Sequence, residues 1–210
     1  MKLISVNVGG LTQVESNGRV VGTGIFKVPV EGRVLGGRRG LEGDRVVDRR
    51  VHGGEHKAVY VYPSEHYAVW AEELDRDDLA PGQFGENFTT EGLTEDAVHI
   101  GDRFRVGGAL LEVTQPRVPC FKLGIKMGDA RFPKRFLKSM RSGFYLRVIE
   151  EGEVGAGDAI ELSEPGVEQI SIRALYALRF QQPRDRDEVK RALSVPALSG
   201  EWRMELSSVL

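Results

Sequence analysis

The sequence predicts a mainly β protein with inserted helices, followed by a small helical C-terminal part. Three observations support this: short strand-like segments fill the first 165 residues, glycine turns separate them, and strand patterns stop after Pro165. Many short strands with regular turns are typical of a closed or nearly closed β-barrel. We therefore expect a barrel domain at residues 1–165 and a three-helix domain at residues 166–210.

The strand prediction depends on alternating or continuous apolar residues bounded by turn residues. The expected strands are KLISVNV (2–8), IFKVPV (25–30), ALLEVTQ (109–115), FYLRVIEEG (144–152) and DAIELSEP (158–165). Glycine–aspartate pairs at 43–44, 101–102 and 157–158 precede strand-like runs, because glycine adopts positive φ and aspartate bonds nearby backbone. The 26 glycines agree with a fold that has many turns.

Helices are expected in three inserted segments and in three C-terminal ones. Within residues 63–74, Tyr67, Trp70 and Leu74 lie on one face, and Ser64 is the expected N-cap. Further helices are expected from Pro119, at 132–140, 169–180, 185–193 and 198–210. A C-terminal unit of about 45 residues buries little apolar surface alone, so we expect it to pack on the barrel or on a partner.

Composition and charge exclude several classes of protein. The formal net charge is −2, so no overall field attracts nucleic acid or a membrane surface. No segment approaches the roughly 18 apolar residues of a membrane span, and the N-terminus has no signal-peptide pattern. With one cysteine the chain forms no intrachain disulfide, and we expect a cytoplasmic protein.

The single cysteine, Cys120, lies in the stretch TQPRVPCFKLG at residues 114–124. Proline favours the first helical position, so Pro119 predicts that Cys120 lies in the opening turn of a helix. The helix dipole, Arg117 and Lys122 would all favour the thiolate, which attacks electrophiles and binds soft metals. The alternative is a buried structural cysteine that acts as a small hydrophobe.

A glycine-rich basic stretch at residues 36–59 is the second candidate. Its glycine N–H groups and its cations, which include Arg38, Arg39 and Lys57, could bind the phosphate of a small ligand. The alternative is a solvated basic loop. His52 and His56 lack the helical spacing of a zinc motif.

The third candidate is the loop PGQFGENFTTEGL at residues 81–93. Glu86 and Asn87 could bind the polar edge of a ring. The alternative is a turn in which Asn87 bonds its own backbone.

Taken together, these stretches resemble one family. The segments GLEGDRVVDRRVHGG, YPSEHYAVW, PGQFGENFTTEGLTE, VHIGDRFRVGGALLEVTQPRVPCFKLG and SGFYLRVIEEGEVGAGD follow the order seen in MOSC domains, named after the molybdenum cofactor sulfurase C-terminal domain. The resemblance covers about residues 1–163 and is strongest to the stand-alone bacterial branch linked to N-hydroxylaminopurine resistance. The tail, with VPALSGEWRMEL, resembles the three-helix domain that often follows.

The resemblance implies a MOSC-type β-barrel and a molybdopterin-type molybdenum cofactor. Cys120 occupies the position of the family's molybdenum ligand, which makes it the expected catalytic and metal-binding residue. The expected cofactor-binding residues are His52, Gly53, Gly54, Asn87, Arg117 and Lys122.

The implied activity is that of an oxidoreductase in detoxification, which reduces N-hydroxylated compounds such as N-hydroxylated purines. One cysteine cannot hold an iron–sulfur cluster of four thiolates. Electrons would therefore come from a separate flavin or iron–sulfur reductase, for which the helical tail offers a docking surface. We expect neither a nucleic-acid nor a membrane partner.

Two other functions stay open. The chain could bind or carry the cofactor, or a sulfurated form of it, without turnover. It could also be a metal-free cysteine hydrolase or transferase, if His52 lies within reach of Cys120 as a base. The basic segment Ile125–Arg141 fits no family pattern and is either a lid that sets substrate choice or a solvated helix.

Overall fold

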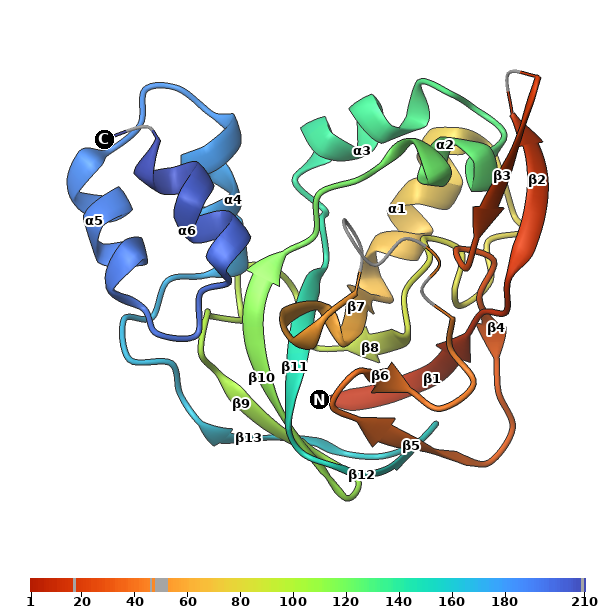
Figure 1. The fold of residues 1–210 in the computed structure, drawn as a ribbon, viewed down its shortest axis with the longest axis horizontal. Helices are drawn as coiled ribbons and strands as arrows, with labels where there is room; N and C mark the ends of the chain where they lie inside the picture. The colour runs from red at the N-terminus through yellow and green to blue at the C-terminus, as the bar shows by residue number, and fades with distance from the viewer. Residues whose placement is uncertain (17, 46, 48–52, 209) are drawn as a thin grey trace.

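A large mixed sheet forms the centre of the molecule in the computed structural model, which describes residues 1–16, 18–45, 47, 53–208 and 210 (Figure 1). Eight strands lie in the order β13-β9-β10-β11-β7-β8-β1-β4, and β7 and β8 are parallel while the other neighbours are antiparallel. The strands are β1 (Lys2–Val8), β4 (Val28–Pro29), β7 (Val59–Pro63), β8 (Phe88–Glu91), β9 (Arg103–Val106), β10 (Ala109–Pro116), β11 (Phe144–Glu150) and β13 (Ile160–Glu164).

The sheet rolls up until its two sides meet. The Leu3 N–H donates to the Asp158 carbonyl at 3.0 Å, and the Ile160 N–H donates to the Met1 carbonyl at 3.0 Å. These bonds join β1 to the chain that enters β13, at the other end of the strand order. The predicted fold class, mainly β with inserted helices, is confirmed.

Two small sheets lie beside the large one. One contains β12 (Gly152–Gly155), β5 (Arg33–Gly37) and β6 (Gly40–Leu41); the other is the hairpin of β2 (Thr12–Ser16) and β3 (Arg19–Thr23). The hairpin stands beside α2 (Phe121–Met127) at the right of Figure 1.

Aromatic side chains fix the inserted helices above the sheet. Besides α2, these are α1 (Glu65–Leu74), α3 (Phe132–Ser139) and a short 3₁₀ helix, η1 (Glu55–Lys57). Trp70 of α1 and Phe136 of α3 are fully buried, and their rings stack at 5.9 Å between centroids. Among the described residues, no helix is both long and apolar enough to span a membrane.

The C-terminal helices pack on the sheet and share its core. They are α4 (Ile172–Phe180), α5 (Arg186–Ser194) and α6 (Gly200–Ser207), and the side chains of Ser171, Asp185 and Ser199 cap their N-termini. Leu175 and Trp202 belong to the same buried cluster as Leu111 of β10. The small helical unit therefore gains its apolar burial from the sheet, as its size predicts.

Some local predictions are wrong. Residues 25–30 form a strand only at Val28–Pro29, because the Lys27 N–H bonds the Ile25 carbonyl in a tight turn. The run that follows the Gly43–Asp44 pair lies mostly outside the described residues. Ser64 has the predicted N-cap position, but its side chain makes no capping hydrogen bond.

Candidate functional site

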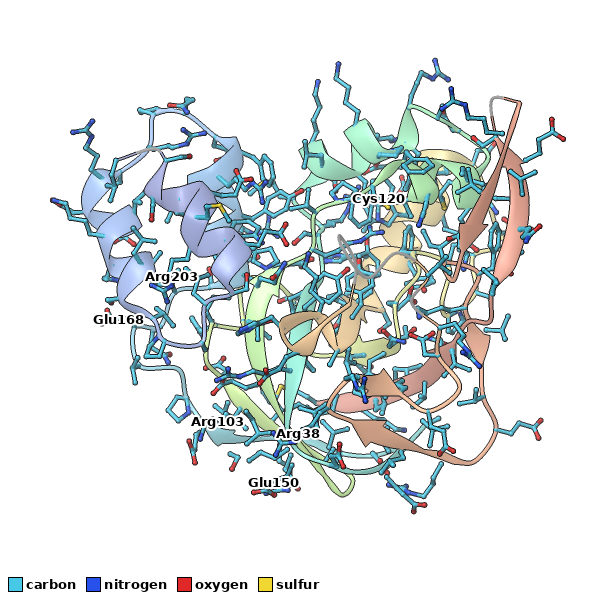
Figure 2. All side chains as sticks on the ribbon, viewed as in Figure 1. Arg38, Arg103, Cys120, Glu150, Glu168 and Arg203 are labelled. Carbon is cyan, nitrogen blue, oxygen red and sulfur yellow. The ribbon has the colours of Figure 1, made fainter. Side chains whose placement is uncertain are left out.

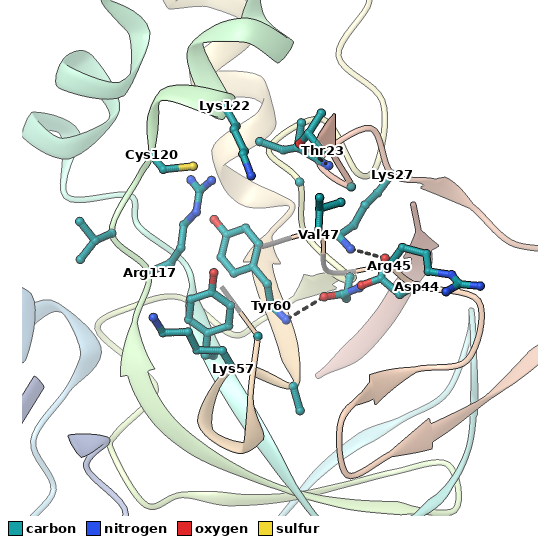
Figure 3. Close-up of a pocket in the computed structure, with 18 residues that line it drawn as sticks. Thr23, Lys27, Asp44, Arg45, Val47, Lys57, Tyr60, Arg117, Cys120 and Lys122 are labelled. Carbon is teal, nitrogen blue, oxygen red and sulfur yellow. Dashed lines mark hydrogen bonds and ion pairs between the residues drawn. The ribbon is translucent and has the colours of Figure 1, made fainter. Parts of the chain in front are cut away.

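A pocket opens between α2, the end of β10 and the loops around residues 24–27, 44–47 and 53–58 (Figure 3). It contains about 720 Å³ of space, counting its open mouth. Five of the predicted site residues line it: Gly53, Asn87, Arg117, Cys120 and Lys122. Gly54 is not among the lining residues, and His52 lies outside the described residues.

Cys120 lies at the start of α2, in the N-cap position with extended backbone. The helix therefore begins one residue after the cysteine, and Pro119 lies before the helix instead of in its first turn. The Cys120 carbonyl accepts from the Leu123 N–H at 3.0 Å. Its thiol is partly exposed, and Figure 3 shows it turned into the same space as the ends of Arg117 and Lys122.

Arg117 is a buried cation without an acidic partner among the described residues. The residue is 5% exposed, and its guanidinium lies over the rings of Tyr60 and Phe136, at 4.9 and 5.2 Å from their centroids. Its Nη1 atom is buried without a hydrogen-bond partner. Among the described residues, no carboxylate forms an ion pair with it. A buried charge of this kind is costly unless an anion compensates it.

The phenols beside Arg117 do not supply that anion. Burial raises the pKa of Tyr60 well above its usual value, and burial also raises the pKa of Tyr145. Both side chains are therefore neutral near pH 7. Cys120 is a further ionisable neighbour, and its thiolate would interact favourably with the Arg117 charge.

The opposite side of the pocket is balanced within the chain. Lys27 and Asp44 form an ion pair, with side chains that are 8% and 5% exposed. Asp44 also accepts from the Gly9 N–H at 2.8 Å and from Asn87 Nδ2 at 2.9 Å. Burial lowers the pKa of Lys27, and Asp44 opposes that shift. We call Lys27, Asp44 and Asn87 the floor of the pocket, and Asp44 holds the other two in place.

The polar atoms of Glu86 and Asn87 bond to other groups of the protein, which favours the structural alternative for this loop. The fully buried Glu86 carboxylate accepts from the N–H groups of Gly82 at 2.7 Å and Phe84 at 3.0 Å. The Asn87 side-chain oxygen accepts from the Tyr60 N–H at 3.1 Å. These two side chains hold the loop in its conformation. Asn87 also positions Asp44 in the pocket by donating a hydrogen bond to it.

The described cations of the basic stretch 36–59 do not all lie at one site. Arg38 and Arg39 form the turn between β5 and β6, and Arg38 lies far from Cys120 in Figure 2. Gly53 and Lys57 do line the pocket, and Lys57 forms an ion pair with Glu201 of α6. Arg49 and Arg50 lie outside the described residues, as does His52, on which the hydrolase hypothesis depends.

The basic segment Ile125–Arg141 contributes no residue to the described pocket wall. Instead, Phe132 and Phe136 anchor it in the aromatic cluster. Arg135 and Arg141 form ion pairs with Glu73 of α1 at 3.1 and 2.7 Å. The segment therefore packs against α1 through apolar contacts and ion pairs.

The lining as a whole favours an anionic ligand that contacts a thiol. Its described residues contain five cations and one carboxylate: Lys27, Arg45, Lys57, Arg117 and Lys122 against Asp44. Sequence reasoning counted Arg45 among the cations of the basic stretch 36–59 but missed Lys27, Tyr60 and Tyr145 as pocket residues. No group of three or more histidine, cysteine or acidic side chains that could bind a metal occurs in the part of the chain that the structure describes.

Comparisons with known proteins identify the family of the chain. The family model "MOSC domain" matches residues 48–161, and the model "YiiM-like, 3-alpha helix domain" matches residues 170–208. The chain is 41% identical to "Uncharacterized protein YflK" of Bacillus subtilis (strain 168), over 96% of this chain and 90% of that protein. It is 38% identical to "Protein YiiM" of Escherichia coli (strain K12), over 85% of this chain and 80% of that protein.

Solved structures and a further relative extend the comparison. The crystal structure of YiiM from Geobacillus stearothermophilus has a TM-score of 0.83 at 37% identity and covers 99% of this chain and 97% of its own. A protein named "Reductase" from Gibberella moniliformis (strain M3125 / FGSC 7600) is 35% identical over 77% of this chain and 29% of its own length.

Proposed function

Because the chain belongs to the MOSC domain family and has a YiiM-like three-helix domain, we propose that it is a molybdenum-cofactor-dependent reductase of N-hydroxylated compounds. MOSC domains are associated with the molybdenum cofactor, and one relative is named a reductase. The observation that supports the proposal most is the orphaned Arg117 Nη1 beside Cys120.

The pocket residues fit the cofactor's chemistry. A molybdopterin cofactor has a phosphate and a negatively charged metal centre, and the cations of the lining complement both. Cys120 would be the metal ligand, since thiolate is a soft ligand suited to transition metals. Arg117, Lys122 and Gly53 would hold the anionic parts of the cofactor. Asn87 would act indirectly, because its amide is bonded to Asp44.

The proposed reaction is a two-electron reduction of an N–OH group. The N–O bond breaks, two electrons and two protons are consumed, and the products are the amine and water. The cofactor supplies the two-electron chemistry when it is bound, and the protein positions it. The electrons come from a separate flavin or iron–sulfur reductase, because the one cysteine of this chain cannot hold a four-thiolate cluster.

Turnover by the cofactor-loaded protein tests the proposal. The protein is purified from a host that makes the cofactor, and 6-hydroxylaminopurine and benzamidoxime are supplied with reduced methyl viologen. We expect the amines to form with wild-type protein and no amine with Cys120→Ser. Bound molybdenum without turnover of either compound would contradict the reductase function and support a cofactor carrier.

A further inference from the structure

The C-terminal helices contribute a charged side chain to the edge of the Cys120 pocket. Glu201, in the first turn of α6, forms an ion pair with Lys57 of η1, which lines the pocket. Figure 3 shows the amine end of Lys57 turned toward the C-terminal helices, in blue at the left, and away from Cys120. The pocket residue and its partner therefore come from distant parts of the chain, 144 residues apart.

The position of Glu201 is fixed by the packing of α6. The next residue, Trp202, is fully buried, and its N–H donates to the Ser199 hydroxyl at 3.3 Å. The Ser199 N–H donates to the Thr114 carbonyl at 3.4 Å, and the Thr114 hydroxyl donates to the His56 carbonyl at 2.6 Å. These bonds connect the start of α6 to η1 through β10, so Glu201 is held beside η1.

The charge of Glu201 reaches the pocket. Burial is the main cause of the raised pKa of Tyr145, a lining residue, and the negative charge of Glu201 raises it further. Lys57 is largely withdrawn from water, with 15% of its side chain exposed. Whereas Lys27 pairs with the lining residue Asp44, Lys57 pairs with a carboxylate that does not line the pocket. Its positive charge is therefore shared between the pocket and the C-terminal helices.

We infer that Glu201 is a positioning residue that limits the affinity of the pocket for anions by holding Lys57. The inference rests on the proposed function for the identity of the natural anion, the phosphate-bearing cofactor, and it adds how the C-terminal helices regulate that site. An anion in the pocket competes with the Glu201 carboxylate for the charge of Lys57. Removing the carboxylate without changing its shape leaves that charge to the ligand.

Titration calorimetry of the cofactor-free protein with inorganic pyrophosphate tests this competition. Glu201→Gln should bind pyrophosphate roughly three- to tenfold more tightly than the wild type, because one nearby negative charge is removed. Breaking an ion pair that only stabilised the fold would not tighten binding. Glu205→Gln is the matched control: Glu205 lies in the same helix and pairs with Arg179 of α4 at 3.2 Å. Its affinity should equal that of the wild type.

A second pair of variants tests whether Glu201 acts through Lys57. Lys57→Met should weaken pyrophosphate binding, and adding Glu201→Gln to this variant should change the affinity less than about twofold. Urea denaturation at pH 7 should show nearly constant stability in Glu201→Gln, because the carboxylate is partly exposed. Unchanged or weaker binding in Glu201→Gln, or the same gain with and without Lys57, would overturn the inference.

Molybdenum retention separates this inference from the proposed function. Cofactor-loaded wild type and Glu201→Gln are dialysed, and molybdenum per chain is followed by elemental mass spectrometry. We expect Glu201→Gln to lose molybdenum several times more slowly. Equal rates of loss would overturn the role of Glu201 while the proposed function stands. Wild-type protein that holds no molybdenum would contradict the proposed function, and the pyrophosphate titration would then decide the role of Glu201.

Discussion

Buried positive charge is balanced on one side of the pocket and unbalanced on the other. On the floor, Lys27 is neutralised by Asp44, which is itself bonded to Asn87 and to the Gly9 N–H. On the wall, Arg117 lies among neutral rings with an unpartnered Nη1. The buried charge of the floor is balanced without a ligand, whereas the buried charge of the wall is balanced only when an anion binds. This contrast predicts that floor residues determine folding and wall residues determine binding.

Removal of Asp44 should have the largest effect on stability. Asp44→Asn leaves the Lys27 ammonium buried without its counter-charge, so the free energy of unfolding should fall by about 3–5 kcal/mol. Urea denaturation at pH 7 measures this loss. Asp78→Asn, which breaks the exposed Arg76–Asp78 pair, is the control and should leave the stability nearly unchanged. Similar losses in both variants would contradict a structural floor.

Lys126, below the floor, should give a smaller effect that depends on pH. Its Nζ atom bonds the carbonyls of Ile25 and Gly82, and burial lowers its pKa from 10.5 to about 8. Between these values the unfolded chain holds a proton that the folded chain has lost, so stability rises with pH.

Comparing the stability of the wild type with that of Lys126→Met isolates the contribution of the Lys126 proton. From pH 8 to pH 10, the stability of the wild type relative to Lys126→Met should rise by about 2 kcal/mol. The subtraction removes the contribution of the buried tyrosines, which titrate in both proteins. A constant difference across this range would show that the Lys126 pKa is not lowered.

Arg117→Met should have the smallest effect on the stability of the cofactor-free protein. Replacing a poorly compensated buried charge by an apolar side chain of similar length is often nearly neutral. We expect a change of under about 1 kcal/mol by urea denaturation. A loss as large as that of Asp44→Asn would mean that the wall is structural and would remove the contrast between the two sides.

Much of the fold follows from local patterns. Strand-like apolar runs predict β1, β10, β11 and β13, and helical spacing predicts α1. The other five helices were expected from proline positions and from the absence of strand patterns. The hairpin of β2 and β3 was missed, since its strands are mostly half-buried or exposed and their apolar pattern is weak. The turn at Ile25–Lys27 was missed because an apolar run was interpreted as a strand.

The pocket was predictable only where one short motif contains its residues. Arg117, Cys120 and Lys122 lie within six residues, and the charge around one thiol indicates their role. Lys27 and Asp44 come from loops whose meeting depends on the rolled sheet, so no local spacing reveals their ion pair. The partners of Glu86 and Asn87 likewise depend on tertiary contacts, and sequence alone left a ligand-binding loop and a structural turn both open.

Bound molybdenum tests the central claim most directly. Wild-type protein, Cys120→Ser and Arg117→Met are purified from one cofactor-producing host, and molybdenum per chain is measured by elemental mass spectrometry alongside circular dichroism. We predict retained molybdenum in the wild type, a nearly complete loss in Cys120→Ser and a strong loss in Arg117→Met, with the fold intact in all three. Folded wild-type protein without molybdenum, or equal retention in all three proteins, would contradict the claim that this wall binds the cofactor.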